Sequence, residues 1–415
     1  MERIDADVLI PGHGGVVENG CVVLDGTKIA YAGPAEDAPN TPAAKKTHRV
    51  PAIMPGMWDC HAHFMGLKTA DLSEAARSSP QVTVVRAAID AELALQAGFT
   101  SVREAGGYGV FLGRLVEEGT LNGPHIYGSG AILSATGGHG DLHSYPLDWV
   151  LSLASSVGFL GICDGVDECL KATRSQLRLG ARVIKVCASG GVLSKFDSPI
   201  HQQFTDAELR TIVEVASMAD RIVMAHCHGK AGIMAALNAG CHSIEHGSYL
   251  DEEAAELMVL RKAILVPTRF IINRLRDFAE VAKLPEESYR KLTLLADRHK
   301  EAMRLAVRKG VQIALGTDIQ TSGAETAVPW GMNASELPCL IEAGMTPLQA
   351  LEAATAMGPL TLGPQAPNSG QLKAGYDADI LALSKNPVQD VSILTNPRNI
   401  IKVWMNGRLV KSLPS

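Results

Sequence analysis

Six side chains that can act as metal ligands lie at or just beyond the ends of short apolar segments of this chain. They are His61, His63, Lys185, His226, His246 and Asp318. Imidazole nitrogens and carboxylate oxygens are donors that zinc-like ions take from proteins. The set therefore predicts a centre for two divalent ions, and its many nitrogen donors favour zinc.

No single member of the set would carry that interpretation. An isolated His-x-His pair in a strand is more often incidental than a metal site, and His226 or His246 alone could be a hydrogen-bonded core histidine. Lys185 alone could send its ammonium group to solvent at the end of a strand. Their common position at strand ends is better explained by shared ligation than by chance.

Two-residue spacing indicates which of these side chains point the same way. Alternate residues of a strand share a face, so His61 and His63 can bind one ion together. The same rule places His228 beside His226. Lys185 is expected to point inward, where burial would lower the pKa of its amine. A neutral amine can take up CO2 to form a carbamate, which is anionic and can bridge two cations.

The elements that position these residues can be recognised from hydrophobic periodicity. Five stretches have a helical period: Val84–Ala97, Asp206–Ala219, Gly229–Ala239, Asp251–Lys262 and His299–Lys309. They alternate with eight strand-like segments: Ile53–His63, Thr100–Ala105, His125–Gly130, Ala181–Ala188, Arg221–His228, Ser243–His246, Ala263–Thr268 and Gln312–Asp318. Such alternation favours a closed (β/α)8 barrel of the TIM type, with the site at the C-terminal ends of its strands.

The two ends of the chain predict a second unit. Residues 1–54 and 365–415 contain short strands and turns without a helical period, and we expect them to meet in one small β-sandwich domain. Residues 55–364 would then form the barrel. Within the barrel, Met345–Gly363 is expected to be a single helix that begins with Thr346 as its N-cap and Pro347 in its first turn.

The composition and charge of the chain limit the classes of binding partner that can be expected. The formal net charge of −6 and the scattered basic residues argue against nucleic acid or an anionic membrane. No apolar segment reaches the length of a membrane span or has the form of a signal peptide, and the eight cysteines lack C-x2-C pairs, so we expect a cytoplasmic location. The apolar stretch Leu142–Gly165 is expected to be a subunit contact of a homo-oligomer, with a lid as the alternative.

Several motifs together resemble the amidohydrolase superfamily, in its imidazolonepropionase-like branch, which includes Xaa-Pro and Xaa-Arg/Lys dipeptidases and ochratoxinase. The matching segments are PGMWDCHAHF, SATGGHGD, GARVIKVCASGGVLS, MAHCHG, SIEHG, LGTD and GQLKAGYDADILAL. The resemblance covers nearly the whole chain, and the combination is specific although a piece such as LGTD alone is weak.

The resemblance implies a role for each ligand candidate. One ion would be bound by His61, His63 and Asp318, a second by His226 and His246, and carboxylated Lys185 would bridge the two. Asp318 would take a proton from the attacking water and pass it to the leaving nitrogen. His228 would donate a hydrogen bond to the substrate carbonyl oxygen, or alternatively support a ligand.

The implied reaction is cleavage of an amide or peptide bond next to a free carboxylate, in dipeptides or in N-acyl amino acids such as ochratoxin A. His139, in the glycine-rich loop Thr136–Asp141, is the first candidate to contact that carboxylate. The loop lacks the lysine and the Ser/Thr of a phosphate-binding P-loop. Arg269 is the second candidate, and an outward-facing surface arginine is its alternative.

Two other functions stay open. The same scaffold could serve a cyclic-amide hydrolase or a deaminase, and the chain could be a non-catalytic metal-binding scaffold protein. The presence of both Asp318 and Lys185 argues against the scaffold protein, because binding alone needs neither a proton acceptor nor a bridging ligand in addition to the histidines.

Overall fold

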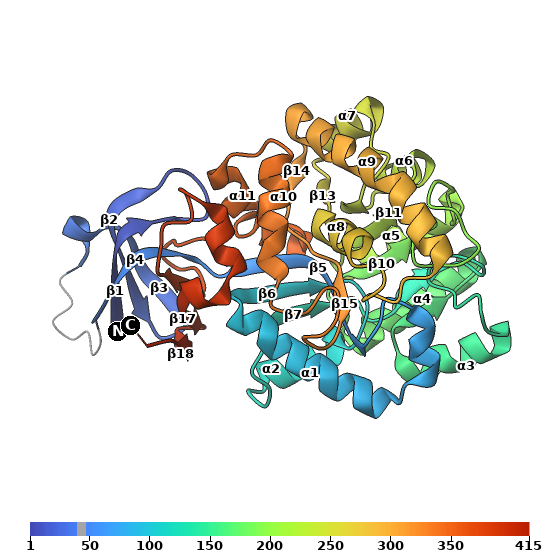
Figure 1. Cartoon of the computed structure of the whole chain (residues 1–415), viewed down its shortest axis with the longest axis horizontal. Helices are drawn as coiled ribbons and strands as arrows, with labels where there is room; N and C mark the ends of the chain where they lie inside the picture. The colour runs from blue at the N-terminus through green and yellow to red at the C-terminus, as the bar shows by residue number, and fades with distance from the viewer. Residues whose placement is uncertain (40–46, 415) are drawn as a thin grey trace.

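A computed structural model describes residues 1–39 and 47–414 of the chain (Figure 1). Three sheets are present in this part of the chain. One lies at the end of the molecule where the two termini meet, and the other two lie at the centre of the remaining body, among its helices. Residues 40–46 and Ser415, which belong to the predicted terminal domain, lie outside the described residues.

Both ends of the chain contribute to the first sheet. Its order is β18 (Arg408–Ser412), β17 (Ile400–Met405), β16 (Ile380–Leu383), β4 (Thr47–Pro55), β1 (Glu2–Leu9), β2 (Val17–Asp25) and β3 (Lys28–Pro34). The two ends join where β16 pairs antiparallel with β4, with Leu381 opposite Met54. Ile4, Val22 and Trp404 pack in the core of this sheet. Hydrogen bonding links the seven strands into one sheet, and their division into a sandwich of two layers stays a prediction.

The other two sheets are entirely parallel, an arrangement that needs crossover connections between neighbouring strands. The smaller has the order β15 (Ile319–Thr321), β5 (Met57–Leu67), β6 (Phe99–Glu104) and β7 (His125–Gly128). The larger has the order β14 (Gln312–Ile313), β13 (Ile264–Val266), β12 (Ser243–His246), β11 (Val223–Cys227), β10 (Ile184–Cys187), β8 (Ile132–Ser134) and β9 (Leu160–Ile162). Each of the eight predicted segments overlaps an observed strand.

Backbone hydrogen bonds connect the two parallel sheets on both sides. The amide of Cys60 in β5 donates to the carbonyl of Leu315, just after β14, at 2.8 Å. The amide of Arg182, just before β10, donates to the carbonyl of Gly128 in β7 at 2.9 Å. The carboxyl ends of β5, β10, β11 and β12 therefore converge on one region of the molecule.

Helices follow most of these strands, and all five predicted helical stretches are helical. The helices are α1 (Pro80–Gln96), α2 (Gly109–Glu117), α3 (Leu147–Val157), α4 (Gly165–Leu179), α5 (Asp206–Ser217), α6 (Lys230–Ala239), α7 (Glu252–Arg261), α8 (Arg269–Asp277), α9 (Glu286–Lys309), α10 (Glu336–Glu342), α11 (Pro347–Ala353) and α12 (Met357–Leu360). Short 3-10 turns span Ala35–Asp37, Leu72–Arg77, Asn333–Ser335, Gly363–Gln365, Val391–Thr395 and Pro397–Asn399. Helix α9 begins thirteen residues before its predicted start, because its buried face includes Ser288 and Lys291, which interrupt the apolar period.

The prediction of one helix over Met345–Gly363 was wrong. Thr346 does cap α11 through a capping box with Gln349, and Pro347 lies in its first turn. The helix ends at Ala353, however, and α12 is a separate turn. A continuous helix would need an amide hydrogen at Pro359 and would bring the proline ring against the carbonyl of Thr355, so the chain breaks between the two segments.

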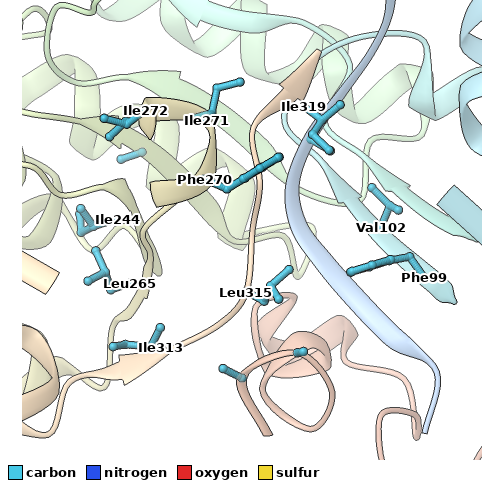
Figure 2. Packing of buried hydrophobic residues seen from close by; sticks show 14 of the residues in the cluster. Phe99, Val102, Ile244, Leu265, Phe270, Ile271, Ile272, Ile313, Leu315 and Ile319 are labelled. Atoms are coloured by element: carbon cyan, nitrogen blue, oxygen red, sulfur yellow. The ribbon is translucent and has the colours of Figure 1, made fainter. Parts of the chain in front are cut away.

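The sides of the strands that face the helices are apolar. Figure 2 shows Ile244, Leu265 and Ile313 lying close together on the neighbouring strands β12, β13 and β14. These three residues lie side by side across the sheet, because Ile244 pairs with Leu265 and Leu265 pairs with Ile313. Because alternate residues of a strand point to opposite sides, Glu245 next to Ile244 faces the interior instead.

The apolar stretch Leu142–Gly165 forms α3 and β9 at the surface. Trp149 on α3 is 67% exposed, and Leu147 and Leu151 are also exposed. Whether this helix is a subunit contact or a lid stays a prediction. No helix in the described part of the chain is long and apolar enough to cross a membrane.

Candidate metal centre

Two clusters of potential ligand atoms lie at the carboxyl ends of the parallel strands. One consists of His61, His63 and Asp318, and the other of His226, His228 and His246; within each cluster the atoms lie within 4.8 Å of one another. The clusters adjoin, because the rings of His61 and His246 have centroids 5.0 Å apart. The structure thus brings together all six predicted ligands, Lys185 included, and adds His228 as a seventh neighbour.

The first cluster is assembled from β5 and the turn that precedes β15. Asp318 Oδ1 lies 3.2 Å from His63 Nε2 and 3.5 Å from His61 Nε2. The turn that carries Asp318 is held by Asp59, whose Oδ2 accepts a hydrogen bond of 2.5 Å from Thr317 Oγ1. Asp318 itself has a left-handed backbone with a φ of 61°, which aspartate adopts more readily than most residues other than glycine, and its carboxylate faces the histidines.

Each histidine of the two clusters uses one ring nitrogen for an outer partner. His63 Nδ1 donates to Gly106 O at 2.7 Å, and His226 Nε2 donates to Gly190 O at 3.1 Å. A carbonyl can only accept, so the opposite nitrogen of each ring keeps its lone pair for a metal ion. Two further rings have hydroxyl partners, Thr268 for His246 Nδ1 and Ser248 for His228 Nδ1. An imidazole that is anchored through one nitrogen and has a free lone pair on the other is the form in which histidine binds a divalent ion.

His61 has a different outer partner, which sequence reasoning missed. Its Nδ1 lies 2.7 Å from Glu245 Oε2. Arg103 Nη2 donates to both oxygens of Glu245, at 2.8 and 2.9 Å, and Ser243 Oγ donates to Oε1 at 2.5 Å. Burial would raise the pKa of Glu245, but the charge of Arg103 and the hydrogen bond from His61 lower it to about 2. His61 is therefore paired with a buried carboxylate anion.

Burial keeps His61, His226 and His246 neutral. It lowers the pKa of His61 to about 4, and it holds the pKa values of His226 and His246 well below the ordinary value. Burial would raise the pKa of Asp318, but His61 and His63 lower it to about 2. Neutral imidazoles and an ionised carboxylate are the protonation states in which these side chains bind metals.

Lys185 is buried and has no direct ion-pair partner among the described residues, and the charges of Glu245 and Asp318 only partly offset the effect of burial on its amine. Its Nζ lies 3.4 Å from His61 Nε2, and it forms no ion pair with a carboxylate among residues 1–39 and 47–414. Burial lowers the pKa of its amine. A buried ammonium without an anionic partner is costly, so the site favours an uncharged or a modified lysine.

Comparison with known proteins identifies the family. A model of the amidohydrolase family matches residues 52–410. The chain belongs to the amidohydrolase family. It is 44% identical to ochratoxinase from Aspergillus niger over 98% of this chain and 86% of that protein. It is therefore a metal-dependent hydrolase that acts on amide bonds.

Solved structures agree with this assignment. The crystal structure of A. niger ochratoxinase aligns with a TM-score of 0.92 and 44% identity, covering 99% of this chain and 95% of that one. A prolidase complexed with N-methylphosphonate-L-proline aligns with a TM-score of 0.91 and 30% identity, over 99% of this chain and 100% of its own. A Xaa-Pro dipeptidase with bound methionine in its active site gives a TM-score of 0.87 and 29% identity, with the same coverage.

The amidohydrolase has a cavity directly above its two histidine clusters. The cavity contains about 710 Å³ of space outside the protein atoms, part of it open to solvent. Both clusters and Lys185 line it, and its wall is largely apolar, with contributions from Val192, Leu193, Ile271, Ile272, Leu275 and Leu292. Small-molecule sites commonly combine such an apolar wall with a few convergent polar groups.

His139 reaches this cavity, as expected of a substrate contact. Its ring stacks on that of His226 with centroids 4.3 Å apart, and its Nδ1 lies 2.8 Å from Ser194 Oγ. The backbone amide of His139 donates to Gln203 Oε1 at 2.9 Å, which fixes the glycine-rich loop. Burial lowers the pKa of His139 to about 4, so this amidohydrolase presents it as a neutral imidazole.

The structure does not bring Arg269 to the cavity. Its side chain is buried, against the surface position considered as the alternative, and Nη1 donates to Ala296 O at 2.6 Å. The residue opens α8 directly after Thr268, whose left-handed φ of 51° turns the chain at that point. Its backbone amide donates a hydrogen bond to Glu336 Oε1 at 2.8 Å. The guanidinium, bonded to a carbonyl of α9, therefore lies among the helices and not in the cavity.

Proposed function

We propose that this amidohydrolase binds two divalent ions and cleaves an amide or peptide bond next to a free carboxylate. The observation that carries the proposal is the adjacency of two ligand clusters around Lys185 at the base of a largely apolar cavity. The names of similar proteins support the proposal: one is an ochratoxinase, and others are a prolidase and a Xaa-Pro dipeptidase. Dipeptides and N-acyl amino acids of the ochratoxin A type are the proposed substrates.

The proposed ligand assignment follows the two clusters. His61, His63 and Asp318 would hold one ion, His226 and His246 the other, and a carbamate on Lys185 would bridge them. The burial of Lys185, which lowers the pKa of its amine, supports the carbamate, because a neutral amine can add to CO2 with release of a proton. Zinc is the proposed metal, since four imidazoles dominate the donor set.

The protein side chains then have distinct tasks. When bound, the ions lower the pKa of water and polarise the substrate carbonyl. Asp318, partly exposed toward the cavity, accepts the proton of the attacking water and delivers it to the nitrogen of the leaving group. If the hydroxyl of Ser248 donates to His228 Nδ1, the ring carries its proton on Nε2 and can donate it to the carbonyl oxygen as negative charge develops.

The proposed substrate contact is His139. Its Nδ1 is oriented by Ser194, and its ring borders both the cavity and a wider outer cleft that leads to solvent. A neutral imidazole can donate one hydrogen bond to a carboxylate from its remaining nitrogen.

We propose that β5, β6, β7 and β10 to β14 form a closed (β/α)8 barrel within residues 55–364, with residues 1–54 and 365–415 as the smaller domain. The hydrogen bonds from Cys60 to Leu315 and from Arg182 to Gly128 support this ring, because they lie where its two remaining seams would be.

A substrate panel tests the reaction. Dipeptides and N-acyl amino acids are assayed as free acids and as C-terminal amides, before metal removal, after it, and after zinc is added back. We expect turnover of free acids that disappears with the metal and returns with zinc. Turnover that survives complete metal removal would refute the proposal, and a preference for cyclic amides or for amine release would favour the cyclic-amide hydrolase or deaminase alternative.

A further inference from the structure

The outer partners of the ligand histidines differ in charge between the two clusters. His63, His226 and His246 are held by neutral partners: the carbonyls of Gly106 and Gly190 and the hydroxyl of Thr268. His61 alone is held by a carboxylate, that of Glu245. The cluster of His61 also contains the carboxylate of Asp318, whereas the other cluster consists of imidazoles only.

Glu245 is held in place from several directions. Arg103 forms two hydrogen bonds to its carboxylate and Ser243 forms a third, and all three side chains are fully buried. Arg103 Nε also donates to Cys60 O at 2.7 Å, the carbonyl that directly precedes His61. One network thus sets both the backbone and the ring of His61.

An anionic acceptor at the outer nitrogen makes an imidazole a stronger donor at its inner nitrogen. The carboxylate stabilises the positive charge that the ring gains when it coordinates a cation, and it holds the ring in one tautomer and one orientation. A carbonyl or hydroxyl partner provides the orientation without the charge. The two clusters should therefore bind the same ion with unequal affinity.

We infer that Glu245, anchored by Arg103, is a positioning residue that makes the His61–His63–Asp318 site the tighter of the two, so that this site fills first and empties last. The inference rests on the proposed binding of two ions. It concerns the order of metal loading, which the proposed reaction alone does not determine.

Withdrawal of metal from the purified, zinc-loaded enzyme tests the inference. Zinc is removed by a chromogenic chelator over a wide range of concentrations, and released zinc is measured by absorbance. The unmodified enzyme should release zinc in two steps. In Glu245→Gln the step that needs more chelator should move to about 10–100-fold lower chelator concentration, while the easier step changes less.

Thr268→Val is the matched control, because it removes the neutral partner of His246 and nearly preserves side-chain volume. It should move the easier step and leave the harder one. Since Glu245→Gln leaves Arg103 buried without its anion, the double variant Arg103→Met with Glu245→Gln removes both charges together, and thermal melting checks that each variant folds. The double variant should show the same shift as Glu245→Gln.

The outcomes separate the inference from the proposed function. A selective shift of the harder step supports the role of Glu245. No shift in a folded variant, or an equal shift of both steps, overturns it. If the unmodified enzyme holds only one zinc ion, the proposed two-ion function fails, and the effect of Glu245→Gln on that single step still decides whether Glu245 strengthens the His61 site.

Discussion

The amine nitrogen of Lys185 lies 3.4 Å from Nε2 of His61, the same ring nitrogen that faces Asp318. As an ammonium group, Lys185 would occupy the lone pair that His61 offers to a metal ion. As a carbamate, it would place two anionic oxygens at the junction of the two clusters. We therefore expect the state of this lysine to determine whether the centre can hold two ions.

Replacement of Lys185 by alanine tests that role. Lys185→Ala should lower kcat/KM by at least ~10²-fold, because the bridging ligand is lost. Added short carboxylic acids should restore part of the activity by occupying the vacated space. The comparison variant is Lys230→Ala on the surface of α6, which should be fully active. Full activity of Lys185→Ala with its metal retained would show that the lysine is not a ligand.

A conservative change at Asp318 separates proton transfer from metal binding. Asp318→Asn keeps the shape and one coordinating oxygen but removes the proton acceptor. We expect kcat to fall by ~10²–10⁴-fold while the metal content falls only modestly. Parallel measurement of kcat and bound zinc checks this, and a proportional loss of both would mean that Asp318 acts chiefly as a ligand.

Substrate amidation tests the contact made by His139. Conversion of the C-terminal carboxylate to an amide removes a hydrogen bond to a charged group, which contributes about 1.5–3 kcal/mol, and so should lower kcat/KM by roughly 10–150-fold. His139→Ala should impair turnover of the free acid strongly and that of the amide much less. Equal cleavage of acid and amide by the unmodified enzyme would contradict the carboxylate requirement.

The pH dependence of stability should contain a contribution from Glu104. Burial raises its pKa to about 8, above the ordinary value of 4.5, and its Oε2 has no hydrogen-bond partner among the described residues. The folded state therefore holds one more proton than the unfolded state between these pH values. The stabilisation is complete below about pH 4.5 and is lost as the pH rises through about 8.

Glu104→Gln mimics the protonated carboxyl and should flatten this dependence. Between pH 5 and pH 8, the decrease in Tm should be smaller in the variant than in the unmodified enzyme by at least about 2 °C. The exposed Glu118→Gln on the turn after α2 is the control and should behave like the unmodified enzyme. Identical pH profiles for Glu104→Gln and the unmodified enzyme would show that Glu104 is ionised when folded.

The grouping of the ligand candidates could be predicted because alternate residues of a strand share a face. His61 with His63, and His226 with His228, share a face in the structure, with ring centroids 5.3 and 4.7 Å apart. The convergence of their strands follows from the parallel alternation of strands and helices, which was also recognisable from periodicity.

Glu245 was missed because the alternation of side chains between the two faces of a strand breaks down at the end of β12. Alternation places Glu245 on the opposite side from His246, and only one of them could be assigned to the interior. In the structure Glu245 follows the alternation, and His246 turns inward because its backbone is left-handed, with a φ of 69°. Arg269 was misplaced for a related reason, since the left-handed Thr268 before it redirects the chain. Single-residue turns of this kind depend on tertiary packing, and periodicity does not reveal them.

Metal stoichiometry at full activity tests the central claim most directly. The enzyme is stripped of metal, zinc is added back in measured portions, and bound zinc and hydrolysis of a free-acid substrate are determined at each point. The account predicts that activity reaches its maximum at about two zinc ions per chain, because the donor set provides two adjacent open sites. Maximal activity at one ion per chain, or with none, would contradict it.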